Sequence, residues 1–253
     1  MPEERISEVR DYYRSILPFY EKESVSRAHL AFWRDLAREL RPNRILELGA
    51  GFGRITAALS AVAPCLGVDV SLEMLATARR RRGTGRARFA AADIRAPIAR
   101  ESFGLIVAPG DPISHVTSLS ERRMILRSAA AALTPGGRVV VEGLYRRRHQ
   151  VTMPVRRVRY ATGVMVIEEA WFPVGVGDLW HARYRYRDRD AARGGVEKRA
   201  SAAFVARSWN PATVRDVFAS AGLRVEALWG DFDRRRFTTA APRMIIVASR
   251  KRP

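Results

Sequence analysis

The sequence has 253 residues, of which 47% are hydrophobic, so it can form one large domain or two small ones with a full core. It carries a formal net charge of +19 and a single cysteine, Cys65, which excludes an internal disulfide and fits a reducing, cytoplasmic location. No apolar run reaches the roughly 18 residues of a membrane span, so we expect no membrane protein.

Arginine supplies almost all of the positive charge, because only three of the 45 basic residues are lysines. A positive field of this size attracts nucleic acids and anionic ligands. The alternative is an arginine-rich coding bias whose side chains face solvent. Since the arginines are spread along the chain and no basic stretch is interleaved with stacking aromatics, we favour the second interpretation. Nucleic-acid binding remains the open, less favoured alternative.

The N-terminal segment 5–40 predicts two helices. Aromatic and aliphatic residues crowd the first, and apolar residues recur at helical spacing in the second, from Leu30 to Leu40. Pro42 ends the second helix, because the residue before a proline avoids the helical conformation. Most of these apolar side chains are expected in the core.

The segment 44–48 predicts a short buried strand, and three glycines at alternate positions then lead into a helix over 55–63. Such a turn brings backbone N–H groups close to a ligand. A dinucleotide fingerprint would need its third glycine at position 54, which is Arg54. Glu47, two residues before the first glycine, suits a cationic or hydroxyl-bearing ligand better than a pyrophosphate.

Strands and helices alternate from residue 44 onward, which predicts a parallel sheet with helices on both of its faces. The predicted strands are 44–48, 66–69, 86–91, 103–108 and 138–142. The predicted helices are 71–82, which Ser71 would cap, and 121–133, with a turn at 134–137. A helix at 211–221 and strands at 223–229 and 244–248 would close the chain.

The spacing of apolar and polar residues changes between residues 150 and 208, where Tyr184 and Tyr186 alternate with arginines. This pattern predicts antiparallel strands, with a turn at 193–195. No linker-like tract bounds the segment, so we interpret it as an insertion after the fifth strand and not as an independent domain.

Two further acids follow predicted strands. Asp69 ends the second strand, where a carboxylate can bind both hydroxyls of a ribose, and Asp93 follows the third. Met74 lies on the next helix, where it could pack on an adenine ring. Each signal alone has an ordinary alternative, a helix cap for the acids and a core position for Met74. Together with Glu47 they place three acids at the edge where open α/β sheets bind ligands.

These elements resemble the class I S-adenosylmethionine-dependent methyltransferases over roughly 41–145 and 209–253. The resemblance rests on the glycine loop with Glu47, on the stretches around Asp69 and Asp93, and on the turn Thr134-Pro135-Gly136-Gly137. The segment 228–247 resembles a subgroup that acts on small molecules.

That family implies a Rossmann-like α/β fold, a seven-stranded sheet whose last strand is antiparallel, with helices on both faces. We therefore expect a single methyltransferase domain over 1–253. Its expected parts are an N-terminal helical lid over 1–40, a cofactor-binding half over 41–149, an antiparallel β insertion on the acceptor side over 150–208, and a closing helix and strand pair over 209–253.

The resemblance also implies the cofactor, S-adenosyl-L-methionine, with S-adenosyl-L-homocysteine as its product. The residues that would hold its methionine end are Glu47, Gly49, Ala50, Gly51 and Gly53. The remaining implied contacts are Asp69 at the ribose, Asp93 and Ile94 at the adenine, and Val70, Met74 and Ala108. We predict no metal site, because one cysteine and scattered histidines give no ligand spacing.

The expected methyl acceptor is a small molecule with an O or N nucleophile. After the fourth strand, methyltransferases of base amino groups carry Asn/Asp-Pro-Pro-Tyr/Phe, whereas this chain has Ala108-Pro109-Gly110-Asp111-Pro112 without the aromatic. Two alternatives stay open: an RNA or protein methyltransferase that uses the basic surface, and a non-catalytic S-adenosylmethionine-binding protein.

The candidate general base is His115, which follows the fourth strand; a packed or capping histidine is an equally supported interpretation. Tyr20 is a second candidate, because N-terminal helices in the family often cover the cofactor. Trp180, His181 and Tyr184 in the insertion are the predicted acceptor-binding residues, with His181 the alternative base. Strand alternation allows only one parity of these neighbours to face a common pocket.

Overall fold

In a computed structural model the chain forms two compact units, which we describe separately. The main unit comprises Arg27–Arg146 and Ser208–Pro253, and the accessory unit comprises Met1–Ser26 and Arg147–Arg207. The structure describes residues 2–23, 27–81, 85–147, 155–160, 162–190, 192 and 194–251. None of the described helices is long and apolar enough to cross a membrane.

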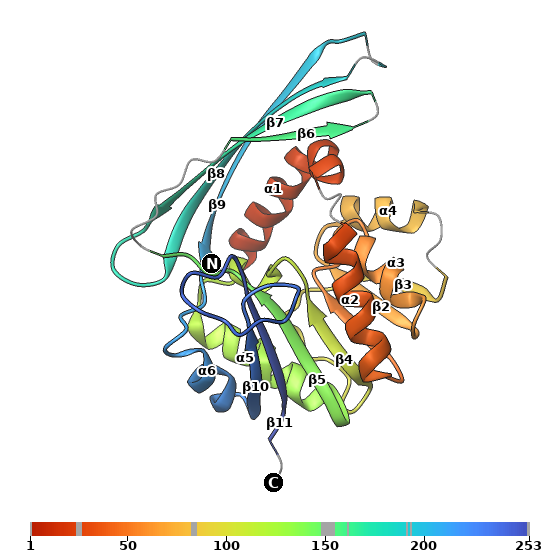
Figure 1. The fold of residues 1–253 in the computed structure, drawn as a ribbon, viewed down its shortest axis with the longest axis vertical. Helices are drawn as coiled ribbons and strands as arrows, with labels where there is room; N and C mark the ends of the chain where they lie inside the picture. The colour runs from red at the N-terminus through yellow and green to blue at the C-terminus, as the bar shows by residue number, and fades with distance from the viewer. Residues whose placement is uncertain are drawn as a thin grey trace. The chain divides into compact units, whose positions relative to one another are not determined.

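The main unit is built on a seven-stranded sheet with the order β10-β11-β5-β4-β1-β2-β3 (Figure 1). Strands β1 to β5 pair in parallel, and β11 runs antiparallel to both of its neighbours, β5 and β10. The predicted sheet with an antiparallel last strand is therefore confirmed. The strands are β1 (Ile45–Leu48), β2 (Cys65–Asp69), β3 (Ala87–Ala91), β4 (Phe103–Ala108), β5 (Leu133–Gly143), β10 (Leu223–Trp229) and β11 (Met244–Arg250).

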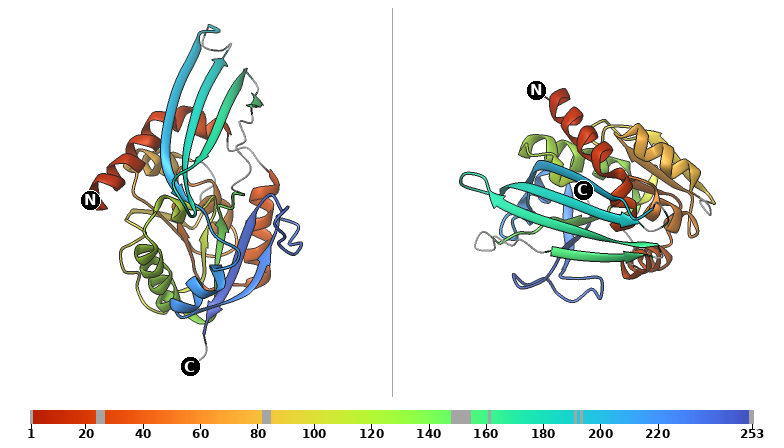
Figure 2. Two further views of the ribbon diagram at one scale, coloured as in Figure 1. Left: turned by 90° about the vertical axis from the view of Figure 1, so that its left-hand side faces the viewer. Right: turned by 90° about the horizontal axis from the view of Figure 1, so that it is seen from above.

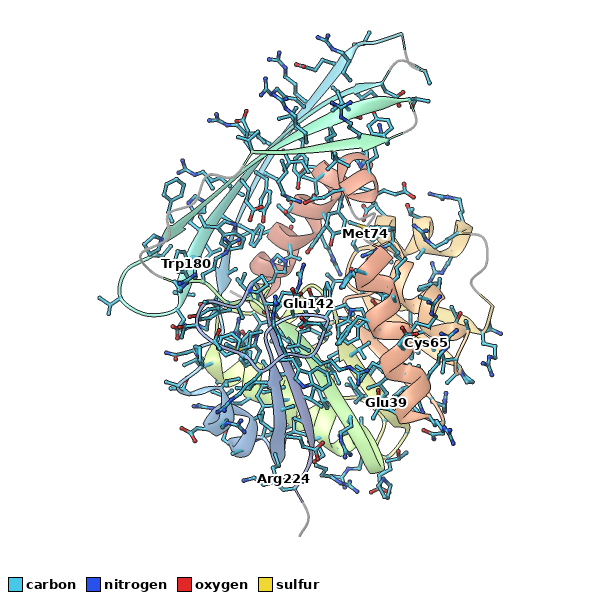
Figure 3. All side chains as sticks on the ribbon, in the orientation of Figure 1. Glu39, Cys65, Met74, Glu142, Trp180 and Arg224 are labelled. Atoms are coloured by element: carbon cyan, nitrogen blue, oxygen red, sulfur yellow. The ribbon has the colours of Figure 1, made fainter. Side chains whose placement is uncertain are left out.

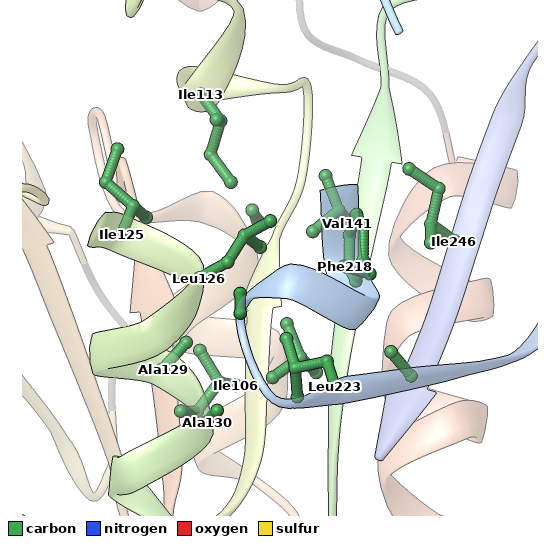
Figure 4. Close-up of a cluster of buried hydrophobic side chains, with 14 of the residues drawn as sticks. Ile106, Ile113, Ile125, Leu126, Ala129, Ala130, Val141, Phe218, Leu223 and Ile246 are labelled. Atoms are coloured by element: carbon green, nitrogen blue, oxygen red, sulfur yellow. The ribbon is translucent and has the colours of Figure 1, made fainter. Parts of the chain in front are cut away.

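Helices cover both faces of this sheet because successive strand residues point to opposite sides. Leu46 and Ile106 pack in one cluster with Phe218, whereas Ile45 and Leu105 pack in the other. Figure 4 shows the first cluster, to which α5 and α6 contribute. The helices of this unit are α2 (Arg27–Leu40), α3 (Arg54–Ser60), α4 (Leu72–Arg80), the short 3-10 helix η1 (Pro112–His115), α5 (Leu119–Ala132) and α6 (Val214–Ser220).

Two local features differ from the sequence-based boundaries. Helix α5 begins at Leu119, because the hydroxyl of Ser118 accepts a hydrogen bond from the amide of Glu121 and caps the helix. The predicted turn at 134–137 lies within β5, where the pairing with β4 jumps from Leu133 to Arg138. The proline and the two glycines of this segment interrupt the strand pairing, which then resumes at Arg138.

The accessory unit is an antiparallel four-stranded meander with one helix on it (Figure 2). The predicted antiparallel segment is confirmed, although Arg193 of its predicted turn lies outside the described residues. Tyr12, Ile16 and Phe19 of the helix pack on Met165 and Tyr186 of the sheet. The elements are α1 (Pro2–Glu23), β6 (Val155–Tyr160), β7 (Gly163–Pro173), β8 (Leu179–Asp190) and β9 (Glu197–Arg207).

The predicted lid over 1–40 divides between the two units. Helix α1 packs on the four-stranded sheet, whereas α2 packs on the main sheet through Trp33 and Leu36. The physical reason is that each helix has its own apolar face and its own sheet to cover. The role of either helix as a lid stays a prediction.

The alternation along β8 separates its charged and aromatic residues. Tyr184 and Tyr186 share the face that α1 covers, and the arginines between them lie on the opposite, exposed face. That exposed face carries Arg183, Arg185, Arg187 and Arg189 from β8, Arg157 and Arg159 from β6, and Arg199 from β9.

Lys22 fastens α1 to the sheet of the accessory unit. Its ammonium donates to Asp188 at 2.6 Å and to Tyr160 at 3.0 Å. Burial alone would lower the pKa of Lys22, but these hydrogen bonds raise it above its ordinary value. The side chain of Asp188 is only 6% exposed, and it also accepts the hydroxyl of Tyr160 at 2.6 Å.

Replacing Lys22 with methionine should destabilise the accessory unit by about 1–3 kcal/mol, because it leaves a buried carboxylate without its cation. Hydrogen exchange of the β8 amides measures the effect. The double variant with Asp188→Asn should recover part of the loss, since it removes the stranded charge. Equal protection in the wild type and in Lys22→Met would contradict this role.

Candidate functional site

The candidate site lies at the edge of the main sheet where the parallel strands end. The chain goes from β1 outward through β2 and β3, and then returns to place β4 on the other side of β1. Such a reversal opens a crevice outside the carboxyl ends of the strands, which is where open α/β sheets bind ligands. The loops after β1, β2 and β4 all reach this edge.

The glycine loop after β1 is held in a conformation that suits glycine. Gly49 has a φ of +70°, and an added Cβ would lie 2.4 Å from the side chain of Pro112, so no larger residue fits there. Gly51 has a φ of +53°, but a Cβ added to it would have no other heavy atom within 4 Å apart from its chain neighbours. The backbone at Gly51 is therefore open to a ligand.

Asp69 ties this loop to the end of β2. One carboxylate oxygen accepts the amide of Gly51 at 2.8 Å, and the other accepts the amide of Ser71, also at 2.8 Å. Burial raises the pKa of Asp69, and these amide hydrogen bonds oppose the rise. The amide of Val70 also binds this carboxylate. Since a carboxylate has about four acceptor positions, room for a hydroxyl donor remains.

Glu47 lies deeper than the loop. It is 2% exposed, and its carboxyl group accepts a hydrogen bond from the hydroxyl of Thr56 on α3. Burial raises its pKa to about 8, so the protonated form predominates at neutral pH. In this structure Glu47 supports α3 beneath the glycine loop, and its contact with the methionine end stays a prediction.

The predicted adenine contacts differ in what surrounds them. Asp93 already accepts the amide and the guanidinium of Arg95, at 2.9 and 2.7 Å, and Arg95 also binds Glu121. An adenine amino group would therefore meet the backbone here more readily than this carboxylate. Met74 is 1% exposed on α4, and Ile94 is half-buried. Of the remaining predicted cofactor contacts, Ala50 and Ala108 are buried and Val70 is half-buried.

The loop after β4 is held in place by a buried carboxylate that the sequence analysis did not single out. Asp111 is 3% exposed, and its Oδ2 accepts the amide of Leu144 at 2.6 Å and the indole N–H of Trp209 at 2.9 Å. Among the described residues its Oδ1 has no hydrogen-bond partner. Burial raises the pKa of Asp111 to about 6, and the nearby charge of Arg122 opposes the rise.

His115, the predicted base, ends the 3-10 helix that follows Asp111. Burial, together with the positive charge of Arg122, lowers its pKa to about 4. The imidazole is therefore neutral at physiological pH. It is also a weaker base than an ordinary histidine, because the most effective catalytic pKa lies near the working pH. Its role as a base stays a prediction.

A second cluster at this edge was also missed. Glu142, labelled in Figure 3, is the next-to-last residue of β5 and accepts the amide of Gly110 at 2.9 Å, His29 at 2.8 Å and Arg243 at 3.1 Å. The pattern of an acid at the end of a parallel strand, which pointed to Asp69, applies equally to Glu142. His29 has no comparable signal, because a lone histidine on an amphipathic helix is usually structural.

The predicted acceptor residues all belong to the accessory unit. Trp180 is 1% exposed and shares its face of β8 with Tyr184, whereas His181 lies on the opposite face. Tyr20 on α1 stacks edge-on against Tyr13, with ring centroids 5.7 Å apart. Trp180 and Tyr184 can thus act together and His181 cannot join them. Their contact with an acceptor stays a prediction.

Within the described ranges, no three His, Cys, Asp or Glu side chains gather as a metal-binding group.

Comparisons with known proteins agree with this geometry. The family model described as "Methyltransferase domain" matches residues 45–137, which run from β1 into β5. No curated protein sequence matches the chain. The chain is therefore similar to methyltransferase domains over the stretch that holds the glycine loop, Asp69 and Asp93.

Solved structures share the fold at low sequence identity. CalS10 from Micromonospora echinaspora, an amino pentose methyltransferase with bound S-adenosylmethionine, is 22% identical with a TM-score of 0.74 over 92% of this chain and 94% of its own. DesVI from Streptomyces venezuelae is 21% identical with a TM-score of 0.77 over 95% and 97%. A Clostridium acetobutylicum S-adenosylmethionine-dependent methyltransferase is 17% identical with a TM-score of 0.78 over 95% and 99%.

Asp111→Ala should lower the free energy of unfolding of the main unit by about 2–4 kcal/mol, because the Leu144 amide and the Trp209 indole lose their acceptor. Denaturant unfolding followed by tryptophan fluorescence measures this. Asp111→Asn is the matched control, since its amide oxygen can still accept both bonds, and its loss should be less than half as large. If both variants lost the same stability, the charge of Asp111 and not its hydrogen bonding would be important.

Proposed function

We propose that this protein transfers a methyl group from S-adenosylmethionine to an O or N nucleophile of a small molecule. The observation that carries the proposal is the glycine loop held by Asp69 at the reversal point of the sheet. The methyltransferase-domain match over residues 45–137 supports it, because that match covers the loop, Asp69 and Asp93.

The residues at this edge fit the proposed cofactor. The open side of Gly51 allows the backbone to approach the methionine part closely, and the remaining acceptor capacity of Asp69 suits a ribose hydroxyl. Ser71 caps α4 by accepting the amide of Met74, which fixes the start of the helix beside Asp69. Here a phosphate would meet the negative charge of Asp69, whereas the sulfonium and ammonium of S-adenosylmethionine are cations.

When bound, S-adenosylmethionine supplies an electrophilic methyl group, so the protein's main task is to position and desolvate the acceptor. Positioning can contribute up to ~7–11 kcal/mol in well-oriented systems. General-base help typically adds a factor of about 10²–10⁴. His115 and Asp111 are the titratable groups of the loop after β4, with pKa values of about 4 and 6. Both can take up a proton only weakly at neutral pH, so we expect positioning to dominate.

We base the chemical class of the proposed methyl acceptor on the structurally similar proteins and on the sequence of the loop after β4. CalS10 is named an amino pentose methyltransferase and KedS8 a sugar N-methyltransferase, and both are under 25% identical to this chain. A small acceptor with an amine or hydroxyl is consistent with those names. We propose Trp180 and Tyr184 as acceptor contacts, with His181 the alternative. A cytoplasmic location fits the buried, free thiol of Cys65.

A second candidate function, binding of nucleic acid through the accessory unit, has one observation in its favour. The exposed face of its sheet carries seven arginines and only two of the acidic residues, Glu168 and Glu197, among the residues described. Arg187 and Arg199 lie directly opposite each other on neighbouring strands, and each is paired with a carboxylate, Glu168 at 2.9 Å and Glu197 at 2.6 Å. Protein interfaces avoid charges at their centre, whereas nucleic-acid interfaces are strongly positive.

Asp69→Ala should weaken binding of S-adenosylhomocysteine by ~1.5–3 kcal/mol, about ten- to 150-fold, because hydrogen bonds to a charged group are lost. Isothermal calorimetry measures the affinity, and thermal unfolding checks that the variant is folded. Asp233→Ala, which changes an acid with a 58% exposed side chain, is the matched control and should bind normally. Unchanged affinity in folded Asp69→Ala would place the ribose elsewhere.

Turnover needs a separate test, because binding alone also fits a non-catalytic protein. Incubation with a labelled methyl donor and a pool of small metabolites should label a product in the presence of the protein. Binding of the cofactor without any labelled product, across pools rich in amines and hydroxyls, would favour the non-catalytic alternative.

The arginine face can be tested by its salt dependence. If it binds nucleic acid, replacing Arg183, Arg185 and Arg187 with alanine should lower the affinity for bulk RNA and flatten its dependence on salt. The matched control replaces three exposed arginines of the main unit, Arg38, Arg79 and Arg80. Equal losses in the two triple variants would indicate general charge and no dedicated face.

A further inference from the structure

His29 lies on α2 with both of its ring nitrogens in short polar contacts. Its Nδ1 is 2.7 Å from Nη2 of Arg54, and its Nε2 is 2.8 Å from Oε2 of Glu142. Arg54 is the first residue of α3, directly after the glycine loop, and Glu142 is the next-to-last residue of β5. The imidazole thus joins the loop after β1 to the end of β5.

These two contacts determine where the proton of His29 lies. A guanidinium has only donors, so Nδ1 must accept the hydrogen bond from Arg54. An imidazole that accepts at Nδ1 is neutral and carries its proton on Nε2. That Nε2–H then donates to the carboxylate of Glu142. The geometry therefore requires one neutral tautomer, with a direction of hydrogen bonding that runs from Arg54 through His29 to Glu142.

Glu142 also binds residues of two further segments. Its Oε2 also accepts the amide of Gly110, in the loop after β4, and its Oε1 accepts Arg243, which precedes β11. Burial alone would raise the pKa of Glu142, but its hydrogen bond to His29, the amide of Gly110 and the charge of Arg243 lower it, so the carboxylate is ionised. The side chain is only 11% exposed, so an unpaired charge here would be costly.

We infer that His29 is a positioning residue that couples the cofactor loop to the loop after β4. It holds Arg54 at the end of the glycine loop and holds Glu142 against the amide of Gly110. The functional part of this inference rests on the proposed function, in which the first loop binds the cofactor and the second lies on the acceptor side. The tautomer and the hydrogen bonds do not depend on it.

The competing explanation is that the His29 ring only fills space. It lies 5.2 Å from the ring of Phe232 and 6.3 Å from that of Trp33, so it does pack among aromatics. Two substitutions separate these roles. His29→Gln keeps one acceptor and one donor but loses the ring, and His29→Phe keeps the ring but loses both hydrogen bonds.

The first measurement uses the unmodified protein without cofactor. Long-range nitrogen–proton NMR correlations should show His29 neutral and protonated at Nε2. A proton on Nδ1, or a cationic ring at neutral pH, would overturn the inference. Because this readout needs neither cofactor nor acceptor, it stands even if the proposed function is wrong.

The second measurement compares the two variants. His29→Phe should speed amide exchange at Gly110 and weaken S-adenosylhomocysteine binding by about tenfold, the loss of one hydrogen bond to a charged group. His29→Gln should recover most of both effects. The opposite order, with phenylalanine better than glutamine, would show that packing alone matters. If S-adenosylhomocysteine bound to no form, Gly110 exchange would still decide the coupling, and the proposed function would fail separately.

Discussion

The hydrogen bond from the amide of Gly51 to the carboxylate of Asp69 is the contact on which the candidate site at the carboxyl ends of the strands depends. Only a residue with a positive φ and no side chain can turn its N–H inward there while leaving the other side of the backbone open. The bond links the ends of β1 and β2, which parallel pairing already places side by side. The conformation of the loop and the orientation of the Asp69 carboxylate, which we propose as the ribose acceptor, therefore depend on this one hydrogen bond.

A second set of charges organises the other half of the same edge. Asp111 connects the loop after β4 to Leu144 and Trp209, which lie near the two ends of the insertion in the sequence. Glu142 fixes the neighbouring Gly110. Both carboxylates are buried. Asp111 accepts a backbone amide and an indole N–H group, and Glu142 accepts a backbone amide together with His29 and Arg243, which lets negative charge persist at low exposure.

The sequence was sufficient for the fold because its signals are local and periodic. The apolar strands, the glycine loop and the cap at Ser71 each follow from neighbouring residues, and the parallel sheet follows from their alternation. The site was only partly predictable. His29 meets Glu142 across 113 positions, and no spacing rule connects them. The arginines are dispersed along the linear sequence, whereas strand alternation gathers those of β8 on one face of the sheet.

A crystal structure with S-adenosylhomocysteine tests the central claim most directly, namely that the edge formed by the glycine loop and Asp69 binds the cofactor. The account predicts the homocysteine part against Gly49 to Gly53, with a ribose hydroxyl on the carboxylate of Asp69. Ligand density at any other edge of the sheet, or a ribose that leaves Asp69 bound only to the amides of Gly51, Val70 and Ser71, would contradict it.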